Sequence, residues 1–469
     1  SQDSSIIGGC VNEIYNSCSS TVIGGNENCI EYFSCGSSIL GGYSNRICYD
    51  SCSSAIVGGY DNSVEDSSCF SAVIAGCENC ISCCSTRSVI IGGDENEICG
   101  QFIFCYTGAP YFGYNSCQTR VCNSVIIGGN DHDILNEAHD SAIIAGDNNC
   151  IKGCVDLGNY VPGIGWQGQY YRDTRRSAII GGRDNVIDQS YDSVIMSSCA
   201  YYYYNTVKKS RGSSIISHYA YIGAQIYNSD NSVIVGGSSF YGFIRDSEDS
   251  AIIAGLDNCM CCSYQSTIVG GRNNLIYEGI KNAIVGGANN CIRLYSDYAS
   301  IIGGIGNRIC NYSDCSTIIG GDYNEISYSS DGSSIIGGNS NEISCSSFYS
   351  SIIGGESHVI SYSSRCAGIF GGRNVTISDS PGSSTFGSLN SCIIGSTQSI
   401  IIGGDDLKII NTDNIVLIPA LTTATFSSSA TFNKWRLGTT KATVGATLKT
   451  TQYVEVQING SIVKLAVIN

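Results

Sequence analysis

A pair of apolar residues followed by glycines, as in SSIIGG, returns along the chain every 16 or 17 residues. The first Gly or Ala after each pair marks the repeat, which begins at Gly8, Gly24, Gly41, Gly58, Ala75 and Gly92. The interval is irregular between Gly92 and Ala254 and regular again from Ala254 to Gly371. A period this short cannot hold two packed helices, but it fits one turn of a β-solenoid. The sequence therefore predicts an all-β protein, a parallel β-solenoid of about twenty turns.

The composition agrees with strands and limits the partners. Ile, Val, Tyr and Cys supply most of the apolar residues, a set that favours strands, and Pro occurs only 4 times. The formal net charge of -16 argues against binding to nucleic acid or to anionic membrane surfaces. No apolar run approaches the roughly 18 residues that span a bilayer. We therefore expect no nucleic-acid partner and no membrane insertion.

Most repeats follow the consensus S-x-I-I-G-G-x-x-N-x-I. It predicts one strand over S-x-I-I, a corner at G-G-x-x-N, where glycine permits a positive φ, and a second strand after it. Asn residues stacked about 4.8 Å apart can form an amide ladder. The predicted ladder contains Asn28, Asn45, Asn62, Asn79, Asn96, Asn307, Asn324 and Asn341. His132 and His358 replace Asn at this position, and we interpret them as substituted corners rather than metal ligands.

The two apolar residues of each pair point to opposite faces of their strand, as expected for Ile335 and Ile336. One lines the interior of the turn and the other emerges outside. Repeated along the solenoid, the outer residues form an apolar row larger than a monomer usually exposes. We expect this row to be buried against another copy of the chain. The alternative is that wide loops or a flattened core shelter it.

The consensus, over residues 4–404, resembles the head repeats of trimeric autotransporter adhesins and the related β-roll repeats of phage and viral fibres. The resemblance implies a left-handed β-roll in which three chains pack around a common axis. It also implies a homotrimer that is extracellular or on the virion surface.

Breaks in the repeat predict four regions: regular turns over 1–99, irregular turns with aromatic insertions over 100–249, regular turns over 250–404, and a C-terminal β cap over 405–469. In the cap, YVEVQINGSIVKLAVIN alternates apolar and polar residues around Asn459-Gly460, which predicts a hairpin. A cap would cover the open strand edges at the end of the solenoid.

The insertions place aromatic residues beside Asp, Arg and Asn, as in GWQGQYYRDTRR and YYYYNTVKK. Flat rings stack on sugar faces while polar neighbours bind hydroxyls, so these segments suit glycan recognition. The candidate ligand-binding residues are Trp166, Tyr170, Tyr171, Asp173, Tyr202, Tyr203, Tyr204 and Tyr241. The alternative is that these rings fill a wider part of the solenoid or seal a subunit junction.

The chain has 27 cysteines, and four of them fall six residues before successive markers: Cys18, Cys35, Cys52 and Cys69. Stacking about 4.8 Å apart puts neighbours within the Cα separation of disulfides. Cys18–Cys35 and Cys52–Cys69 are the predicted pairs, unless the column links chains. Zinc is the competing explanation for the clusters CENCISCC and CMCC. We favour disulfides or inert thiols and predict no metal and no cofactor.

Together these features predict a structural fibre or adhesin, a homotrimeric solenoid that displays aromatic loops for attachment to a surface glycan. One alternative is an extracellular filament subunit held by Cys and Tyr contacts. Another is a tail-spike depolymerase acting through acids such as Asp173 or Asp246. The sequence shows no Ser/His/Asp or nucleotide-binding pattern, so we expect no enzyme.

Overall fold

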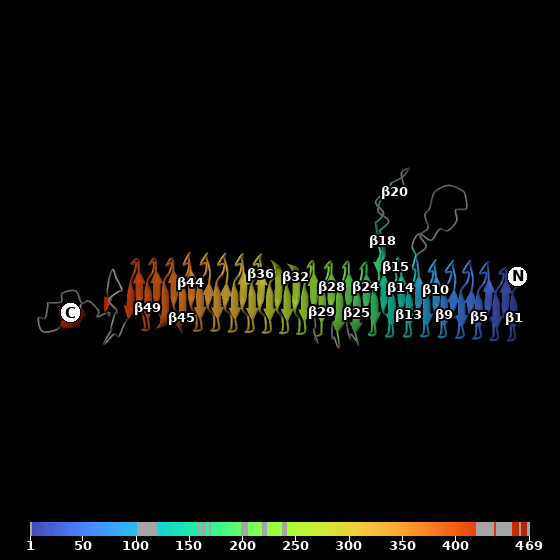
Figure 1. The fold of residues 1–469 in the computed structure, drawn as a ribbon, viewed down its shortest axis with the longest axis horizontal. Coiled ribbons are helices and arrows are strands. Elements are labelled where there is room, and N and C mark those ends of the chain that lie inside the picture. The colour runs from blue at the N-terminus through green and yellow to red at the C-terminus, as the bar shows by residue number, and fades with distance from the viewer. Residues whose placement is uncertain are drawn as a thin grey trace. The chain divides into compact units, whose positions relative to one another are not determined.

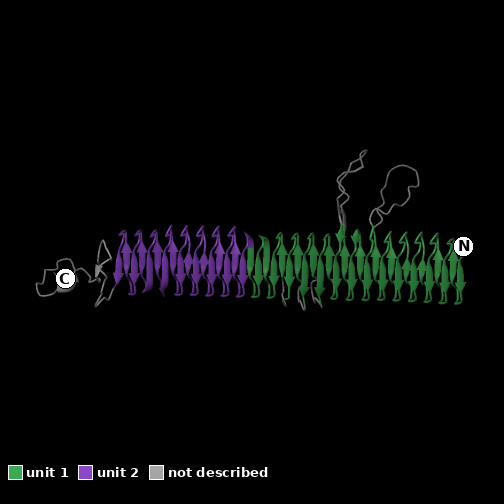
Figure 2. Ribbon diagram, in the orientation of Figure 1, with its two compact units in different colours: residues 1–276 green, residues 277–469 purple. Residues whose placement is uncertain are grey.

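Each repeat forms one turn with two short strands, and successive turns stack through parallel pairing. The computed structural model describes residues 2–100, 120–156, 159–161, 165–167, 170–197, 205–217, 223–236, 242–418, 436–437, 453–458 and 461–466. Between 154 and 172 and beyond 418 the description is limited to the backbone. These residues confirm the predicted fold class, an all-β parallel β-solenoid, with about 21 turns of about 17 residues. The chain divides into two compact units, 1–276 and 277–469 (Figure 2).

In unit 1 the strand before each glycine pair belongs to a first sheet, in which every strand pairs in parallel with the next (Figure 1). Its strands are β1 (Ser5–Ile7), β3 (Thr21–Ile23), β5 (Ser38–Leu40), β7 (Ala55–Val57), β9 (Ala72–Ile74), β11 (Val89–Ile91), β13 (Val125–Ile127), β16 (Ala142–Ile144), β23 (Ala178–Ile180), β25 (Val194–Ser197), β27 (Ser214–Ser217), β29 (Val233–Val235), β31 (Ala251–Ile253) and β33 (Thr267–Val269).

The strand after each corner belongs to a second parallel sheet. In unit 1 it contains β2 (Glu13–Tyr15), β4 (Cys29–Glu31), β6 (Arg46–Ile47), β8 (Ser63–Val64), β10 (Cys80–Ser82), β12 (Glu97–Cys99), β14 (Asp133–Leu135), β17 (Cys150–Lys152), β24 (Val186–Asp188), β26 (Thr206–Lys208), β28 (Gln225–Tyr227), β30 (Phe243–Arg245) and β32 (Cys259–Tyr264). Strand β34 (Leu275–Ile280) begins in unit 1 and ends in unit 2.

Unit 2 repeats this arrangement. Its first sheet contains β35 (Ala283–Val285), β37 (Ser300–Ile302), β39 (Thr317–Ile319), β41 (Ser334–Ile336), β43 (Ser351–Ile353), β45 (Gly368–Arg373), β47 (Ser384–Leu389), β49 (Ile400–Ile402), β51 (Val416–Ile418) and β52 (Arg436–Leu437). Its second sheet contains β36 (Cys291–Arg293), β38 (Arg308–Cys310), β40 (Glu325–Ile326), β42 (Glu342–Ile343), β44 (Val359–Ser361), β46 (Thr376–Ser378), β48 (Cys392–Ile394) and β50 (Lys408–Ile410).

The core of most turns contains one apolar residue from each sheet, such as Ile39 and Ile47, both fully buried, whereas β47 places Thr385 at this position. The corner Asn and two serines complete the interior, and in the turn of Ile39 they are Asn45, Ser51 and Ser54. Since the side chains of a strand alternate, the residues on either side of each buried Ile or Val face outward. The core is therefore a set of stacked columns, two of them aliphatic and three polar.

The second glycine of each pair is required for a steric reason. Gly25 has a φ of 76°, and a Cβ there would overlap the Asn28 amide and the carbonyl of Gly42. At Gly24 a Cβ would meet no atom within 4 Å, and Ala75 takes the equivalent place in a later turn. The second glycine therefore lets the corner close over the Asn column.

The insertions in unit 1 leave the stacking register intact. Strand β11 pairs directly with β13, with Ile90 opposite Ile126, although residues 101–119 lie between them in sequence. Strand β17 likewise pairs with β24 across a hairpin arm of antiparallel strands. That arm contains β18 (Cys154–Asp156), β19 (Asn159–Val161), β20 (Gly165–Gln167) and β21 (Tyr170–Arg172). Beside its base, β15 (Ala138–His139) and β22 (Thr174–Arg175) pair in parallel.

In unit 2 the parallel pairing continues past residue 404, since β50 pairs with β48 and β51 pairs with β49. Leu407, Ile409 and Leu417 are buried like the isoleucines before them. The last turn therefore lies inside the region predicted as a cap. Further on, β53 (Tyr453–Ile458) and β54 (Ser461–Ala466) form the predicted antiparallel hairpin. Its predicted turn, Asn459-Gly460, is outside the described residues. No helix among the described residues is long and apolar enough to cross a membrane.

Candidate functional site

The first sheet of each unit presents one outward apolar side chain per turn, the residue after the core-facing one, which is buried in every turn but the first, where Ile6 is itself 47% exposed. We call this set the apolar row. In unit 1 the exposed fractions run from 37% at Ile144 to 58% at Ile7, with Val235 less exposed. The row in unit 1 contains Ile7, Ile23, Leu40, Val57, Ile74, Ile91, Ile127, Ile144, Ile180, Met196, Ile216, Val235, Ile253 and Val269. In unit 2 it contains Val285, Ile302, Ile319, Ile336, Ile353, Phe370, Phe386 and Ile402.

The neighbours of the apolar row are small. In each three-residue strand the residue before the buried one is usually Ser, Thr, Ala or Val, half-buried on the same face. Ser334 and Ser351 touch through their hydroxyls across adjacent turns, 3.1 Å apart. This face therefore consists of a column of small residues beside a column of aliphatic ones. The small side chains leave room for another surface to pack closely against the aliphatic column.

The Asn residues predicted as a ladder lie stacked inside the glycine corner. Asn45 Nδ2 donates to Asn28 Oδ1 at 3.1 Å, and the Asn45 backbone N–H donates to the same oxygen. Contacts of the same kind join Asn62, Asn79 and Asn96 in unit 1. In unit 2 the backbone N–H groups of Asn324 and Asn341 donate to the preceding Asn307 and Asn324. The left-handed residue is the one before each Asn, for example Glu27.

His132 and His358 continue this column as substituted corners. The Asn149 backbone N–H donates to His132 Nδ1 and the Val375 N–H to His358 Nδ1, both at 3.2 Å. Both rings are fully buried, and burial lowers the pKa of each imidazole. The rings therefore take the acceptor role that the Asn oxygen plays in other turns.

The four predicted disulfide cysteines form a column at the opposite corner of unit 1. The Cys18 backbone N–H donates to Cys35 Sγ at 3.2 Å, and Cys35 and Cys52 make the same contact with Cys52 and Cys69. The Sγ atoms of Cys18 and Cys35 are 2.8 Å apart, and this contact raises the pKa of the Cys18 thiol. All four are free thiols in the structure, so the disulfides stay a prediction.

The same column holds a polar group that the sequence analysis missed, formed by Cys122, Glu137 and His139. His139 Nε2 lies 3.0 Å from Glu137 Oε2, and His139 Nδ1 accepts the Cys122 backbone N–H at 3.2 Å. The hydrogen bond to His139 lowers the pKa of Cys122, while Cys122 and Glu137 raise that of His139 to about 9. The ring accepts the Cys122 N–H only in its neutral form, so protonation of His139 would break that contact. Cys122 and His139 fall six residues before a marker, like Cys18, and that spacing was the signal in the sequence.

The predicted ligand-binding residues fall mostly on the hairpin arm. Trp166 is the Cα partner of Tyr160, and Tyr170 and Tyr171 are the partners of Asp156 and Val155. Asp173, at the base of the arm, forms an ion pair with Arg175. The arm thus collects several of the predicted aromatic residues in a few antiparallel pairs. Tyr202, Tyr203, Tyr204 and Tyr241 lie outside the described residues.

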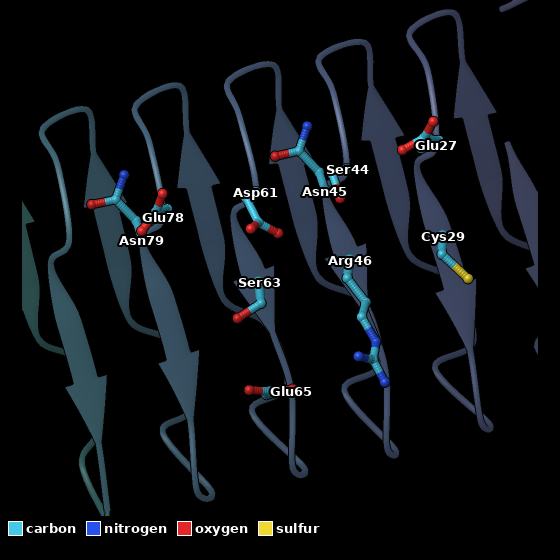
Figure 3. A pocket seen from close by; sticks show the side chains of 10 residues that line it. All are labelled: Glu27, Cys29, Ser44, Asn45, Arg46, Asp61, Ser63, Glu65, Glu78 and Asn79. Carbon is cyan, nitrogen blue, oxygen red and sulfur yellow. The ribbon is translucent and has the colours of Figure 1, made fainter. Parts of the chain in front are cut away.

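An open groove of about 420 Å³ lies on the second sheet of unit 1 (Figure 3). Figure 3 shows Glu27, Asp61 and Glu78 along its corner and Arg46 and Glu65 further down the strands. Arg46 forms an ion pair with Glu31 at 2.9 Å, so its charge is already compensated. The groove is therefore acidic, which disfavours anionic ligands.

No protein-family model matches the chain, and no curated protein matches its sequence.

Proposed function

We propose that the protein is a structural fibre subunit that assembles as a homotrimer through the apolar row. The observation that carries this proposal is the exposed apolar side chain, in most cases aliphatic, on every regular turn. In unit 1 alone the row leaves on the order of 1,000 Å² of apolar surface in water, against the few hundred Å² that monomers usually expose. An area of that size matches one side of a stable protein interface.

A second copy of the chain is the partner that fits this surface best. The partner must offer an apolar side chain about every 4.8 Å along the whole row, and a parallel copy has that repeat. The row is narrow, one aliphatic residue wide beside a column of small residues, so each subunit meets its neighbours along an edge. The resemblance of the repeats to trimeric adhesin heads and viral fibres supports three copies around one axis. It also supports a location outside the cell or on a virion.

Native mass spectrometry of the reduced full chain tests the assembly. We expect a mass three times that of one chain. Replacing Ile319 and Ile336 by Lys should shift the population toward single chains, because two charges would be buried at the interface. Tyr323→Lys combined with Tyr349→Lys adds the same charges at exposed corners and should leave the trimer intact. A single-chain mass for the unmodified protein would refute the proposal, and steady growth with concentration would favour the filament.

We further propose that the hairpin arm attaches the fibre to a surface glycan. Trp166 and Tyr160 are cross-strand partners in the β19–β20 pair, and Tyr170 is the partner of Asp156 in the β18–β21 pair, so the arm combines aromatic and acidic residues in two short ladders. Aromatic residues next to a carboxylate are typical of sugar sites. The trimer should bind members of a glycan array, and Trp166→Ala should remove that binding without changing the number of chains in the assembly. Equal glycan binding by the Trp166→Ala variant would exclude the arm as the attachment site.

A further inference from the structure

Strand β32 departs from strict alternation near its middle, as β34 and β47 also do. Met260 and Ser263 point into the core, while Cys261 and Cys262, neighbours in sequence, are both half-exposed. Cys262 has a φ of 54°, a left-handed conformation that turns its side chain to the side that Cys261 already occupies. The two Sγ atoms are 3.3 Å apart. A regular strand would have placed these two thiols on opposite faces.

A carboxylate from the preceding turn completes the group. Arg245 is the Cα partner of Cys261, so the next residue, Asp246, stacks on Cys262, and it too is left-handed, with a φ of 48°. A carboxylate oxygen of Asp246 and the two sulfur atoms all lie within 4.8 Å of one another. Asn228 Nδ2 donates to Asp246 Oδ1 at 2.6 Å, which orients the carboxylate.

We propose that Asp246, Cys261 and Cys262 bind a thiophilic divalent cation of the Zn²⁺ and Cd²⁺ class. Such ions take thiolate at about 2.3 Å and carboxylate oxygen at about 2.0–2.2 Å, so tetrahedral ligand atoms lie roughly 3.5–4 Å apart. The observed separations require only small side-chain movements to reach that geometry. Three protein ligands leave the fourth position open to water or to a further ligand. Cys259, part of the same CMCC cluster, does not belong to the group.

Bound protons and the Arg245 guanidinium compete with a metal ion for the ligand atoms of this site. Burial, followed by the hydrogen bond to Cys262, raises the pKa of Cys261 to about 12, so an ion must displace the proton of this thiol. Arg245 Nε lies 3.1 Å from Asp246 Oδ2 and neutralises the carboxylate in the absence of an ion. The affinity should therefore rise when Arg245 loses its charge.

Cadmium titration of the reduced, metal-free full chain, followed by the thiolate-to-cadmium absorption band, tests the site. Because other thiols also bind cadmium, the decisive quantity is the difference between variants. We expect Cys261→Ser combined with Cys262→Ser to lose one tight equivalent, and Cys259→Ser to keep it. Asp246→Asn should weaken this equivalent at least about tenfold, and Arg245→Gln should strengthen it severalfold. The proposal is overturned if the double variant binds as many equivalents as tightly as the parent. It is also overturned if Cys259→Ser removes the equivalent.

Discussion

The two glycines of each corner meet different surroundings although they are neighbours in the chain. At Gly337 a Cβ would have no atom within 4 Å, whereas at Gly338 it would overlap the Asn341 amide and the carbonyl of Gly355. Both residues have positive φ values, 68° and 84°. Backbone strain is therefore common to both positions, and collision with the Asn ladder distinguishes the second.

Alanine substitutions at these two positions should separate strain from collision. Gly337→Ala should lower the free energy of unfolding by about 1–2 kcal/mol, the cost of a left-handed alanine. Gly338→Ala should lower it by about 3 kcal/mol or more, because the corner must open. Denaturant unfolding at one fixed protein concentration measures both values. Equal losses for the two variants would show that the ladder does not require the second glycine.

Each buried histidine makes the free energy of unfolding depend on pH. Burial lowers the pKa of His358, so the folded ring stays neutral at a pH where the unfolded ring, with a pKa near 6.5, is charged. The unfolded chain then binds more protons, and stability falls as the pH drops below about 6.5. His358→Asn restores the consensus residue and should reduce the loss of stability between pH 7 and pH 5. Asn341→His should increase it. Unfolding curves at the two pH values measure the change, and parallel pH profiles for all three proteins would contradict this explanation.

At the scale of the element, each turn is held by polar columns as well as by isoleucine. Ser37 and Ser54 are buried, and the Ser54 backbone N–H donates to Ser37 Oγ at 3.1 Å. Ser54 Oγ in turn donates to the carbonyl of Ser68 at 3.1 Å. With the Asn column, these contacts satisfy backbone groups that a short strand leaves unpaired at its ends. The short strands can therefore stack without a large aliphatic core.

Removing one ladder member should affect the turns on both sides of it. In Asn324→Ala the Asn341 N–H loses its acceptor, and the carbonyl of Gly338 loses an amide donor. We expect a loss of about 2–3 kcal/mol in the free energy of unfolding, since these groups stay buried. Tyr323→Ala, at the exposed neighbouring residue, should change it by less than about 0.5 kcal/mol. Denaturant unfolding of both variants measures the contrast, and similar values would mean that the ladder contributes little.

The strands, the corners and the Asn column could be predicted from the sequence, because a strict period aligns chemically similar residues. The burial of the serine columns could not, because the consensus marks Ser37 and Ser54 as recurring positions but no apolar pattern shows that they face the core. The facing thiols of Cys261 and Cys262 depend on one left-handed residue, which alternation alone does not reveal. The contact between His139 and Glu137 could not be predicted either, because it joins residues on the two sides of an irregular corner.

At the scale of the whole molecule, the repeat creates a surface that a single chain leaves exposed. The buried residue and the apolar row come from the same adjacent pair, so every turn that builds the core also adds to the row. A fibre formed in this way grows more stable with each turn, since core and interface lengthen together. Charge should have little part in the proposed contact between copies, because most residues of this face are aliphatic or small.

Hydroxyl-radical footprinting of the reduced full chain tests most directly whether the apolar row is an interface. In one chain Ile302, Ile319 and Ile336 are as much as 46% exposed, and Tyr323 and Tyr349 are more exposed still. We predict that oxidation of the isoleucines falls severalfold below the level expected from these exposed fractions, while the tyrosines react fully. Isoleucines that react as their single-chain exposure predicts, in concentrated protein, would contradict the account.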